Sequence, residues 1–392
     1  MNDFPYLDRD AIYLDSACQS LRPQPVIDAL NNYYTQHNSC GERVKYQWGR
    51  ITDEKVAEAR TKVLRFLKLK ERDYFVSFTL NTTYGINLIL DQIRLSVVSK
   101  VMTSDIEHNS PFLSTIAFAR KHTSAGKVRM DREVIIRNPD GSIHIDDYDF
   151  TRALVVVNCA TNFDGRKLEN IQALVKKIHK QNGIIIIDAA QAMAHSPEIL
   201  YKTDADAVCF SAHKMYAPSL GVMVVKKSML DKIDTTFIGG GMVDDADLDT
   251  YKLSANSPNH IHTKFEAGLQ AYGEIVALSA AIDWLNSLPK SAHSNLAENA
   301  QELFSFLANQ PQVHLVNTAP NPVMSFYIEG IDSHLLGAAL ADEGVMARAG
   351  YFCAHYYLDH KMHYPPLLRF SLGYHTRPSD IEKTITTFKK IL

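Results

Sequence analysis

The sequence lacks the features that mark several large classes of protein. No window reaches the ~18 uninterrupted apolar residues of a membrane-spanning helix. The N-terminal stretch MNDFPYLDRDAIYLDSA has neither a basic n-region nor an apolar h-region. With 41 basic and 44 acidic side chains the formal net charge is only −3, and no basic stretch favours nucleic acid. We therefore expect a cytoplasmic protein without a membrane or nucleic-acid partner.

Cysteine-rich and nucleotide-binding motifs are also missing. The number of cysteines is odd and none are in C-x-x-C spacing, so we expect free thiols rather than disulfides or a cysteine-rich zinc site. There is no G-x-x-x-x-G-K-[ST] and no H-E-x-x-H motif, and the glycine cluster at 237–243 lacks the G-x-G-x-x-G spacing. The sequence therefore does not favour phosphoryl transfer or a nicotinamide-dependent reaction. The five cysteines are Cys18, Cys40, Cys159, Cys209 and Cys353.

The sequence does show short β-branched runs that alternate with amphipathic segments, such as the helical pattern at 166–181. This alternation predicts a mostly parallel α/β sheet. The four consecutive isoleucines Ile184–Ile187 are typical of a strand that helices cover on both faces. The runs that we expect to form strands lie at 73–78, 100–104, 153–158, 183–188, 206–210 and 221–226.

The pattern changes near residue 271. Two long helical patterns at 271–287 and 293–309 are followed by short strands near 322–328 and 366–371 and by a helix from Ser379. A chain of 392 residues is long enough for one large domain and a smaller one. We therefore expect a second, smaller α+β domain at the C-terminal end.

The stretch from Asp188 to Pro218 concentrates reactive side chains at predicted strand ends. Asp188 ends a central strand, and ligands of open α/β sheets bind at such ends. Ser211 and Lys214 follow the next strand. A pyridoxal phosphate enzyme needs a lysine that binds the cofactor, a carboxylate at the ring nitrogen and donors for the phosphate. Each residue alone is typical of a turn or an exposed surface, but their joint occurrence favours this cofactor.

The segments DAAQ and FSAHKMYAPSLGVMVVKK within and after this stretch resemble the class V aminotransferase family of fold-type I pyridoxal phosphate enzymes, and most of all its cysteine desulfurases. The resemblance implies a large cofactor-binding α/β domain over 15–270 with a mostly parallel, seven-stranded type of sheet. It assigns 1–14 and 271–392 to the smaller α+β domain. It extends through AIYLDSACQSLRP (11–23), NTTYGINLIL (81–90), DIEHNSPF (105–112), TNFDG (161–165), KFEAG (264–268) and LLRFSLGYHT (367–376).

The resemblance also implies roles for single residues. Lys214 would carry the cofactor and move a proton, Asp188 would face the ring nitrogen, and Arg369 would bind the substrate carboxylate. His108 would stack on the ring and assist proton transfer, unless it is only a loop histidine. The other implied cofactor ligands are Thr82 and Thr83 at the phosphate, Asn162 and Gln191 at the phenolic oxygen, and Ser211 with His213 beside the lysine. Helix capping by the threonines, a turn at Asn162 and an internal salt bridge of Arg369 remain alternatives.

The segment ARAGYFCAHYYL (347–358) resembles the cysteine-bearing loop of the desulfurases. Cys353 would then be the nucleophile that takes sulfur from the substrate, leaving a persulfide and alanine. The alternatives are a packing cysteine or a metal site with the histidines at 355, 360 and 363. We expect no metal, because the spacing fits no common metal motif.

The chain departs from the family pattern at several positions. Leu269 stands where members usually carry a threonine that reaches the partner subunit's cofactor phosphate, and Ala349, Tyr351 and Phe352 replace more polar residues near the cysteine. The resemblance implies a homodimer that uses pyridoxal 5'-phosphate as a cysteine desulfurase, releases L-alanine from L-cysteine and passes sulfur to an acceptor protein. The alternatives are another class V aminotransferase, epimerase or C–S lyase, or a scaffold without turnover.

Overall fold

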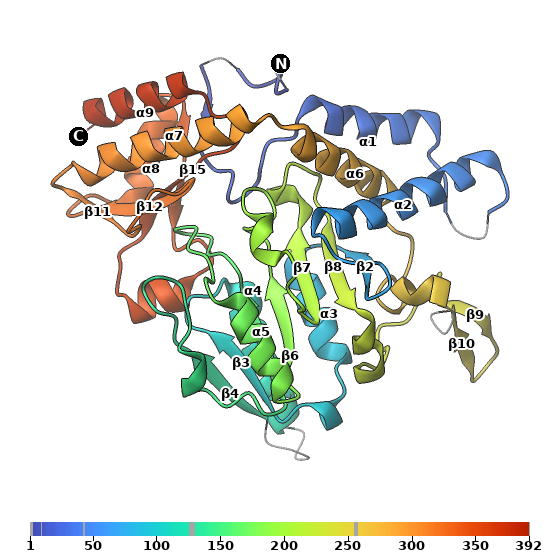
Figure 1. Cartoon of the computed structure of the whole chain (residues 1–392). Coiled ribbons are helices and arrows are strands. Elements are labelled where there is room, and N and C mark those ends of the chain that lie inside the picture. Colours follow the sequence, from blue (N-terminus) through green and yellow to red (C-terminus); the bar gives the residue numbers. More distant parts are fainter. Residues whose placement is uncertain (1–2, 9, 42–43, 125–129, 255–257, 392) are drawn as a thin grey trace.

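A seven-stranded sheet forms the centre of the computed structural model, which describes residues 3–8, 10–41, 44–124, 130–254 and 258–391 (Figure 1). The strand order is β2-β8-β7-β6-β5-β3-β4. Only β8 runs antiparallel to its neighbours in this sheet. The predicted α/β class with a mostly parallel sheet is confirmed. The strands are β2 (Tyr74–Thr79), β3 (Lys100–Ser104), β4 (Asp131–Ile135), β5 (Ala153–Asn158), β6 (Ile184–Asp188), β7 (Ala207–Ser211) and β8 (Gly221–Lys226).

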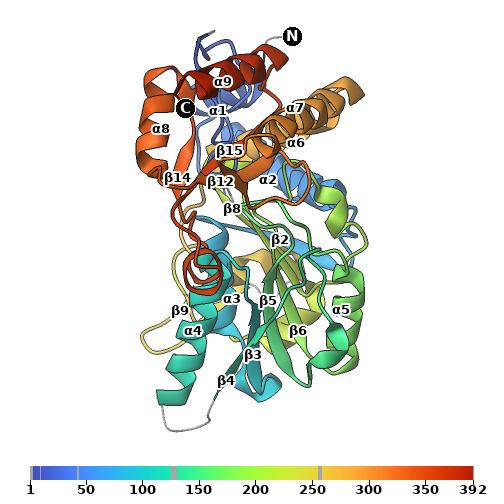
Figure 2. The same ribbon diagram turned by 90° about the vertical axis from the view of Figure 1, so that its left-hand side faces the viewer.

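Both faces of the large sheet are covered, as the isoleucine run of β6 predicts. Ile184 and Ile186 belong to one buried cluster, whereas Ile185 and Ile187 belong to another. The helices α3 (Thr82–Gln92) and α4 (Asn109–Ser124) lie on one side of the sheet and α5 (Ile171–Lys180) lies on the other (Figure 2). Consecutive side chains of a strand point to opposite faces, so this strand has no polar position except its end at Asp188.

Helix α5 begins at Ile171, five residues later than the predicted start at 166. The residues before it pair with the chain after β5 instead: the Leu168 N–H donates to the Cys159 carbonyl at 3.0 Å, and Lys167 forms a bridge with Ala160. These tertiary hydrogen bonds outweigh the helical periodicity of the segment. Strand β4 was not among the predicted strands, because its charged residues Asp131 and Arg132 mask the apolar signal.

A second, four-stranded antiparallel sheet with the order β11-β12-β15-β14 lies beside the large one. Its strands are β11 (Val313–Leu315), β12 (Val323–Ile328), β14 (Arg348–Gly350) and β15 (Leu367–Ser371). It packs with α7 (Lys290–Ala308), α8 (Ser333–Asp342) and α9 (Pro378–Ile391) around one apolar cluster. The short strand β1 (Ile12–Tyr13) pairs with β13 (Val345–Met346), and Asp15 forms a bridge with Ser371. The N-terminal segment is thereby attached to the second sheet.

Three further helices pack together at one end of the large sheet: α1 (Gln24–Gln36), α2 (Gln47–Phe66) and α6 (Tyr272–Ser287). The buried face of α6 belongs to the core of the large sheet, whereas α7 belongs to the core of the second sheet. The predicted division of the chain at residue 271 stays a prediction. A hairpin of β9 (Val243–Ala246) and β10 (Tyr251–Leu253) extends from the same side as α1 and α2 (Figure 1). No helix in the described ranges is long and apolar enough to cross a membrane.

Candidate active site

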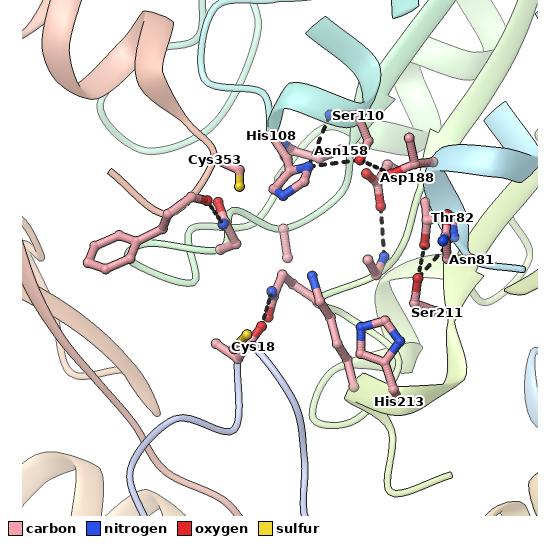
Figure 3. A pocket seen from close by; sticks show the side chains of 18 of the residues that line it. Cys18, Asn81, Thr82, His108, Ser110, Asn158, Asp188, Ser211, His213 and Cys353 are labelled. Atoms are coloured by element: carbon pink, nitrogen blue, oxygen red, sulfur yellow. Dashed lines mark hydrogen bonds between the residues drawn. The ribbon is translucent and has the colours of Figure 1, made fainter. Parts of the chain in front are cut away.

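A cavity of about 270 Å³ lies where the carboxyl ends of the strands of the large sheet face the loops of the second sheet (Figure 3). Because β2, β3, β5, β6 and β7 are mutually parallel, the residues that follow them meet at one edge. All of the predicted site residues line this cavity: Thr82, Thr83, His108, Asn162, Asp188, Gln191, Ser211, His213, Lys214, Cys353 and Arg369. Their roles stay predictions, but the cavity brings them together.

The first turn of α3 forms one wall of the cavity. Asn81 caps this helix by accepting the Tyr84 N–H at 2.9 Å. Thr82 bonds to Ser211 twice, through its N–H at 2.9 Å and through its hydroxyl at 2.7 Å. Thr83 bonds to the Ser110 hydroxyl at 2.5 Å. The helix N-terminus and these hydroxyls form a donor-rich surface suited to a phosphate, although part of their capacity serves helix capping and packing.

Asp188 and Lys214 line the same cavity, and their pKa values are shifted in opposite directions. Burial raises the pKa of Asp188, against the Ala190 N–H and Lys214, which lower it. The Ala190 N–H donates to Asp188 Oδ1 at 2.9 Å and fixes the carboxylate at the end of β6. Burial lowers the pKa of Lys214, and Arg369 acts in the same direction, whereas Asp188 opposes the shift. A buried carboxylate favours a cationic partner, and a lysine with a lowered pKa has an available amine.

His108 is held as a neutral imidazole. Its Nδ1 accepts the Ser110 N–H at 3.0 Å and lies 2.9 Å from the Ser110 hydroxyl. Burial, together with the positive charges of Lys214 and Arg369, lowers the pKa of His108 to about 3. Since Nδ1 accepts a backbone proton, the ring proton is on Nε2. A neutral, fixed ring is suited to lie against an aromatic cofactor.

Two predicted ligands of the phenolic oxygen also make contacts within the protein. The Gln191 amide donates to the Ala17 carbonyl at 2.8 Å, and the Asn162 amide donates to the Phe352 carbonyl at 2.5 Å. Gln191 thus joins the cavity to the N-terminal segment, and Asn162 joins it to the cysteine loop. His213 likewise accepts the Ser20 hydroxyl at its carbonyl, at 2.9 Å. Burial, with Lys214 and Arg22, lowers the pKa of His213 to about 4.

Arg369 is the largest fully buried side chain in the described part of the chain, with 2% of its surface exposed. It donates to Asp15 and to the Asn162 carbonyl, both at 2.8 Å, and its guanidinium lies over the Phe352 ring at 4.6 Å. The internal salt bridge that was an alternative to substrate binding is therefore present. Arg369 Nε is buried and has no hydrogen-bond partner among the described residues, so the guanidinium keeps an unused donor.

Cys353 is exposed at the cavity on a tightly held loop after β14. Phe352 and Cys353 both have left-handed backbone conformations, with φ values of 47° and 58°. Such residues are disfavoured by roughly 1–2 kcal/mol each unless tertiary contacts compensate. The Asn109 N–H donates to the Cys353 carbonyl at 2.6 Å, and Asn162 holds the Phe352 carbonyl. These contacts fix the exposed thiol at the cavity.

The loop continues into a π-helical turn, Tyr356–Lys361, which packs on residues that follow β3 and β5. Tyr356 stacks on Phe112 with ring centres 4.5 Å apart, and Tyr357 stacks on Phe163 at 5.3 Å. Lys361 forms an ion pair with Asp105. No group of three or more His, Cys, Asp or Glu side chains that could hold a metal ion occurs in the described part of the chain.

Sequence reasoning missed several residues that line the cavity. Asn158 ends β5 at the same edge as Asp188, and its position at the end of an apolar run was a usable signal. Ser110 lies two residues after His108 in the same quoted segment. Cys18 and Arg348 also line the cavity and contact each other, with Arg348 Nη1 2.7 Å from the Cys18 sulfur. No sequence spacing connects those two residues, because they lie at opposite ends of the chain.

Beneath the cavity, Glu107 is buried between β3 and β5. It accepts the Ser104 hydroxyl and, at 2.7 Å, the Asn158 N–H. Burial raises the pKa of Glu107 to about 8; Asp188 acts in the same direction, whereas Arg137 opposes it. Glu107 therefore retains its proton at neutral pH and joins the ends of the two strands as an uncharged group.

The residues present fit pyridoxal phosphate. A lysine amine, a strand-end carboxylate, a neutral imidazole and a helix N-terminus with hydroxyls all border one cavity. Asp188 forms no salt bridge within the described part of the chain, and a protonated ring nitrogen would provide a cationic partner. The donor surface at α3 is suited to the phosphate.

Comparison with known proteins finds similar sequences and a similar solved structure. A probable cysteine desulfurase of Vibrio cholerae serotype O1 is 28% identical over 392 residues, covering 97% of this chain and 93% of that protein. One from Chlamydia muridarum is 29% identical over 408 residues, covering 100% and 98%. The apo structure of a cysteine desulfurase from Thermococcus onnurineus NA1 has a TM-score of 0.85 at 25% identity, covering 97% of this chain and 94% of its own. The family model described as aminotransferase class-V matches residues 12–384, and this chain therefore belongs to that family.

Proposed function

We propose that the protein is a pyridoxal phosphate-dependent cysteine desulfurase, which converts L-cysteine to L-alanine and holds the released sulfur as a persulfide on Cys353. The observation that carries the proposal is the exposed Cys353 thiol at the same cavity as Lys214, Asp188 and Arg369. An aminotransferase needs Lys214, Asp188 and Arg369, but its reaction does not require the thiol. The names of the curated relatives, cysteine desulfurases that span nearly the whole chain, support the same choice.

Lys214, Asp188, His108 and the first turn of α3 would hold the cofactor. When bound, pyridoxal phosphate supplies an electron sink that makes the bonds around the substrate's α carbon labile. Asp188 would lie at the ring nitrogen, and Thr82, Thr83 and Ser211 would donate to the phosphate. The remaining cofactor ligands that we propose are Asn162, Gln191 and His213.

The buried arginine, lysine and histidine, whose pKa values are lowered, would bind the substrate and move protons. Arg369, which lines the cavity, would bind the substrate carboxylate through its guanidinium, with Asp15 holding the guanidinium in place. Lys214, whose pKa burial lowers, would take the proton from the substrate's α carbon. His108 stays neutral, with its proton on Nε2 at the cavity.

Sulfur transfer would take place at Cys353. The Cys353 thiolate would attack the substrate sulfur, and the sulfur would remain on Cys353 as a persulfide. The carbon–sulfur bond would break with its electron pair left on the substrate's β carbon, which takes a proton and becomes the methyl group of alanine. The contacts of Asn162 and Asn109 with the loop keep the thiol directed at the cavity. An acceptor protein would then remove the sulfur from this exposed position.

Product analysis tests the function. The holoenzyme is incubated with L-cysteine and a reductant, and alanine, sulfide and pyruvate are measured for the wild type, Cys353→Ser and the matched control Cys40→Ser. We expect equal amounts of alanine and sulfide from the wild type and Cys40→Ser. Cys353→Ser should lose both products at least about a hundredfold, because a hydroxyl is scarcely ionised at neutral pH. Pyruvate in place of alanine would favour a C–S lyase, and wild-type alanine production by Cys353→Ser would contradict the desulfurase.

The homodimer and the cytoplasmic location also belong to this proposal. Large apolar side chains are exposed on α1, α2 and the β9–β10 hairpin, including Tyr34, Trp48 and Tyr251 at 49–55%, and Leu269 is 75% exposed. A second copy of the chain would cover these side chains. Leu269 would then face the partner subunit at the position where family members usually carry a threonine hydroxyl. All five cysteines are free, as a reducing compartment allows. Light scattering of the holoenzyme tests the dimer, and a monomer at micromolar concentration would contradict it.

A further inference from the structure

We propose that Cys18 is a second sulfur-carrying thiol of this site, which takes the outer sulfur of the Cys353 persulfide and returns Cys353 to its free form. The inference rests on the proposed function, because it needs sulfur on Cys353. Both thiols line the same cavity, although they come from distant parts of the chain. In the view of Figure 3, Cys18 and Cys353 border the cavity opposite Thr82 and Ser211.

The segment that carries Cys18 is fixed by both sheets. The Ala17 N–H donates to the Ser371 hydroxyl of β15 at 3.0 Å, and the Ala17 carbonyl accepts the Gln191 amide at 2.8 Å. The Cys18 N–H closes a turn on the Asp15 carbonyl at 3.0 Å. The thiol therefore has a defined place beside the cavity, partly shielded from solvent.

Arg348 distinguishes Cys18 from an ordinary packing cysteine. Arg348 Nη1 lies 2.7 Å from the Cys18 sulfur and 3.6 Å from Asp15, whose other oxygen binds Arg369 at 2.8 Å. Cys18 is thus joined through charged groups to the arginine that we assign to the substrate carboxylate. Reactive cysteines lie beside such cations, because the thiolate is the nucleophile.

The other cysteines lack this setting. Cys159 and Cys209 are fully buried, and burial raises the pKa of both thiols. Cys40 is exposed, but it does not line the cavity and its thiol donates to the Gly41 carbonyl at 3.3 Å. Cys18, Cys353 and Lys214 all line the same cavity.

The transfer balances without an oxidant or reductant. The Cys18 thiolate attacks the outer sulfur of the Cys353 persulfide, a new bond forms between that sulfur and Cys18, and the bond to the Cys353 sulfur breaks. Cys353 leaves as a thiolate, and the proton stays with the transferred sulfur. An outer sulfur extends the reach of Cys353 by about 2 Å, the length of a sulfur–sulfur bond.

The burst of alanine measures the number of sulfur-carrying thiols. The holoenzyme is mixed with L-cysteine in the absence of a reductant, and alanine per chain is counted while added sulfur is mapped on alkylated peptides. We expect about two alanines per wild-type chain and about one for Cys18→Ala, because each thiol stores one sulfur before turnover stops. Cys40→Ala is the matched control and should give the wild-type burst. In the wild type, sulfur should appear first on the Cys353 peptide and then on the Cys18 peptide.

Each result separates the relay from the proposed function. A burst of about one in the wild type, with sulfur on Cys353 but never on Cys18, overturns the relay and leaves the desulfurase intact. Sulfur on Cys18 in Cys353→Ser also overturns the relay, since Cys18 would then be charged without Cys353. Absence of both alanine and added sulfur overturns the proposed function and the relay together.

Alkylation tests the part assigned to Arg348 without turnover. The holoprotein is treated with iodoacetamide before any L-cysteine is added, and labelling of Cys18 is followed by mass spectrometry. Arg348→Gln should slow labelling of Cys18 several-fold while labelling of Cys40 stays at the wild-type rate. An unchanged rate at Cys18 would overturn the role of Arg348 in the relay.

Discussion

The two walls of the active-site cavity are built in different ways. The wall formed by the large sheet carries Asp188 and Ser211 at the ends of parallel strands, and their place follows from backbone pairing within the sheet. The opposite wall carries Cys353 on a loop with two left-handed residues, which the Asn162 side chain and the Asn109 backbone N–H hold in place. We infer that the first wall is rigid by construction and serves the cofactor, whereas the second depends on a few contacts and serves sulfur transfer.

Loss of Lys214 is expected to have the largest effect, because it removes the reactive group of the sheet wall. Lys214→Ala should abolish covalent attachment of the cofactor and lower turnover by roughly 10³-fold or more, the scale of a lost general base and nucleophile. Borohydride reduction and peptide mapping of the wild type should place the cofactor on Lys214. Lys176→Ala, an exposed position on α5, is the control. Attachment to any other lysine would refute the assignment.

Arg369 lies between the two walls, and its loss should affect substrate more than cofactor. Arg369→Ala should weaken apparent binding of L-cysteine roughly a hundredfold, because a charge-assisted contact of about 2–3 kcal/mol disappears. The absorption spectrum of the bound cofactor should stay nearly unchanged. Arg369→Lys should recover only part of the affinity, since lysine lacks the planar fork. An unchanged KM in Arg369→Ala would show that the salt bridge with Asp15 is its only role.

A substitution at Asn162 should weaken the attachment of the Cys353 loop and leave the wall formed by the large sheet intact. Asn162→Ala removes the hydrogen bond to the Phe352 carbonyl, so we expect sulfur transfer to Cys353 to slow about tenfold, consistent with a lost hydrogen bond to a strained segment. The affinity for the cofactor should change less than the rate of sulfur transfer. Stopped-flow measurement of cofactor binding and of sulfur transfer checks the difference. Equal losses in both steps would mean that Asn162 acts chiefly on the cofactor.

The smallest expected effect concerns the pH dependence of stability at the base of the sheet wall. Burial raises the pKa of Glu107 from 4.5 to about 8, so between these values the native state keeps a proton that the unfolded state releases. The free energy of unfolding therefore falls as pH rises through this window. Glu107→Gln cannot titrate, and its amide can donate to Ser104 while its carbonyl accepts the Asn158 N–H.

Calorimetry at pH values across this window checks the effect of Glu107. We expect the fall in Tm from about pH 5 to about pH 8 to be smaller in Glu107→Gln than in the wild type. Glu302→Gln makes the same chemical change on the exposed surface of α7 and is the control. An identical fall in all three proteins would contradict a protonated Glu107 at neutral pH.

The same contrast explains what the sequence could predict. Strand β6 and the cluster after it were predictable, because four isoleucines define a strand buried on both faces and Asp188 ends it. The Cys353 loop was found only through its resemblance to a family, since no periodicity describes left-handed residues at 352 and 353. The contact between Cys18 and Arg348 was not predictable, because it arises when β1 and β13 bring the two ends of the chain together.

The location of the first sulfur tests the central claim most directly. The wild-type holoenzyme is mixed with L-cysteine without a reductant, quenched by alkylation at the earliest measurable time and digested, and each cysteine peptide is weighed. The desulfurase that we propose predicts one added sulfur on the peptide that carries Cys353, in step with the first alanine released. Alanine without any sulfur on Cys353, or a first sulfur on Cys40, Cys159 or Cys209, would contradict it.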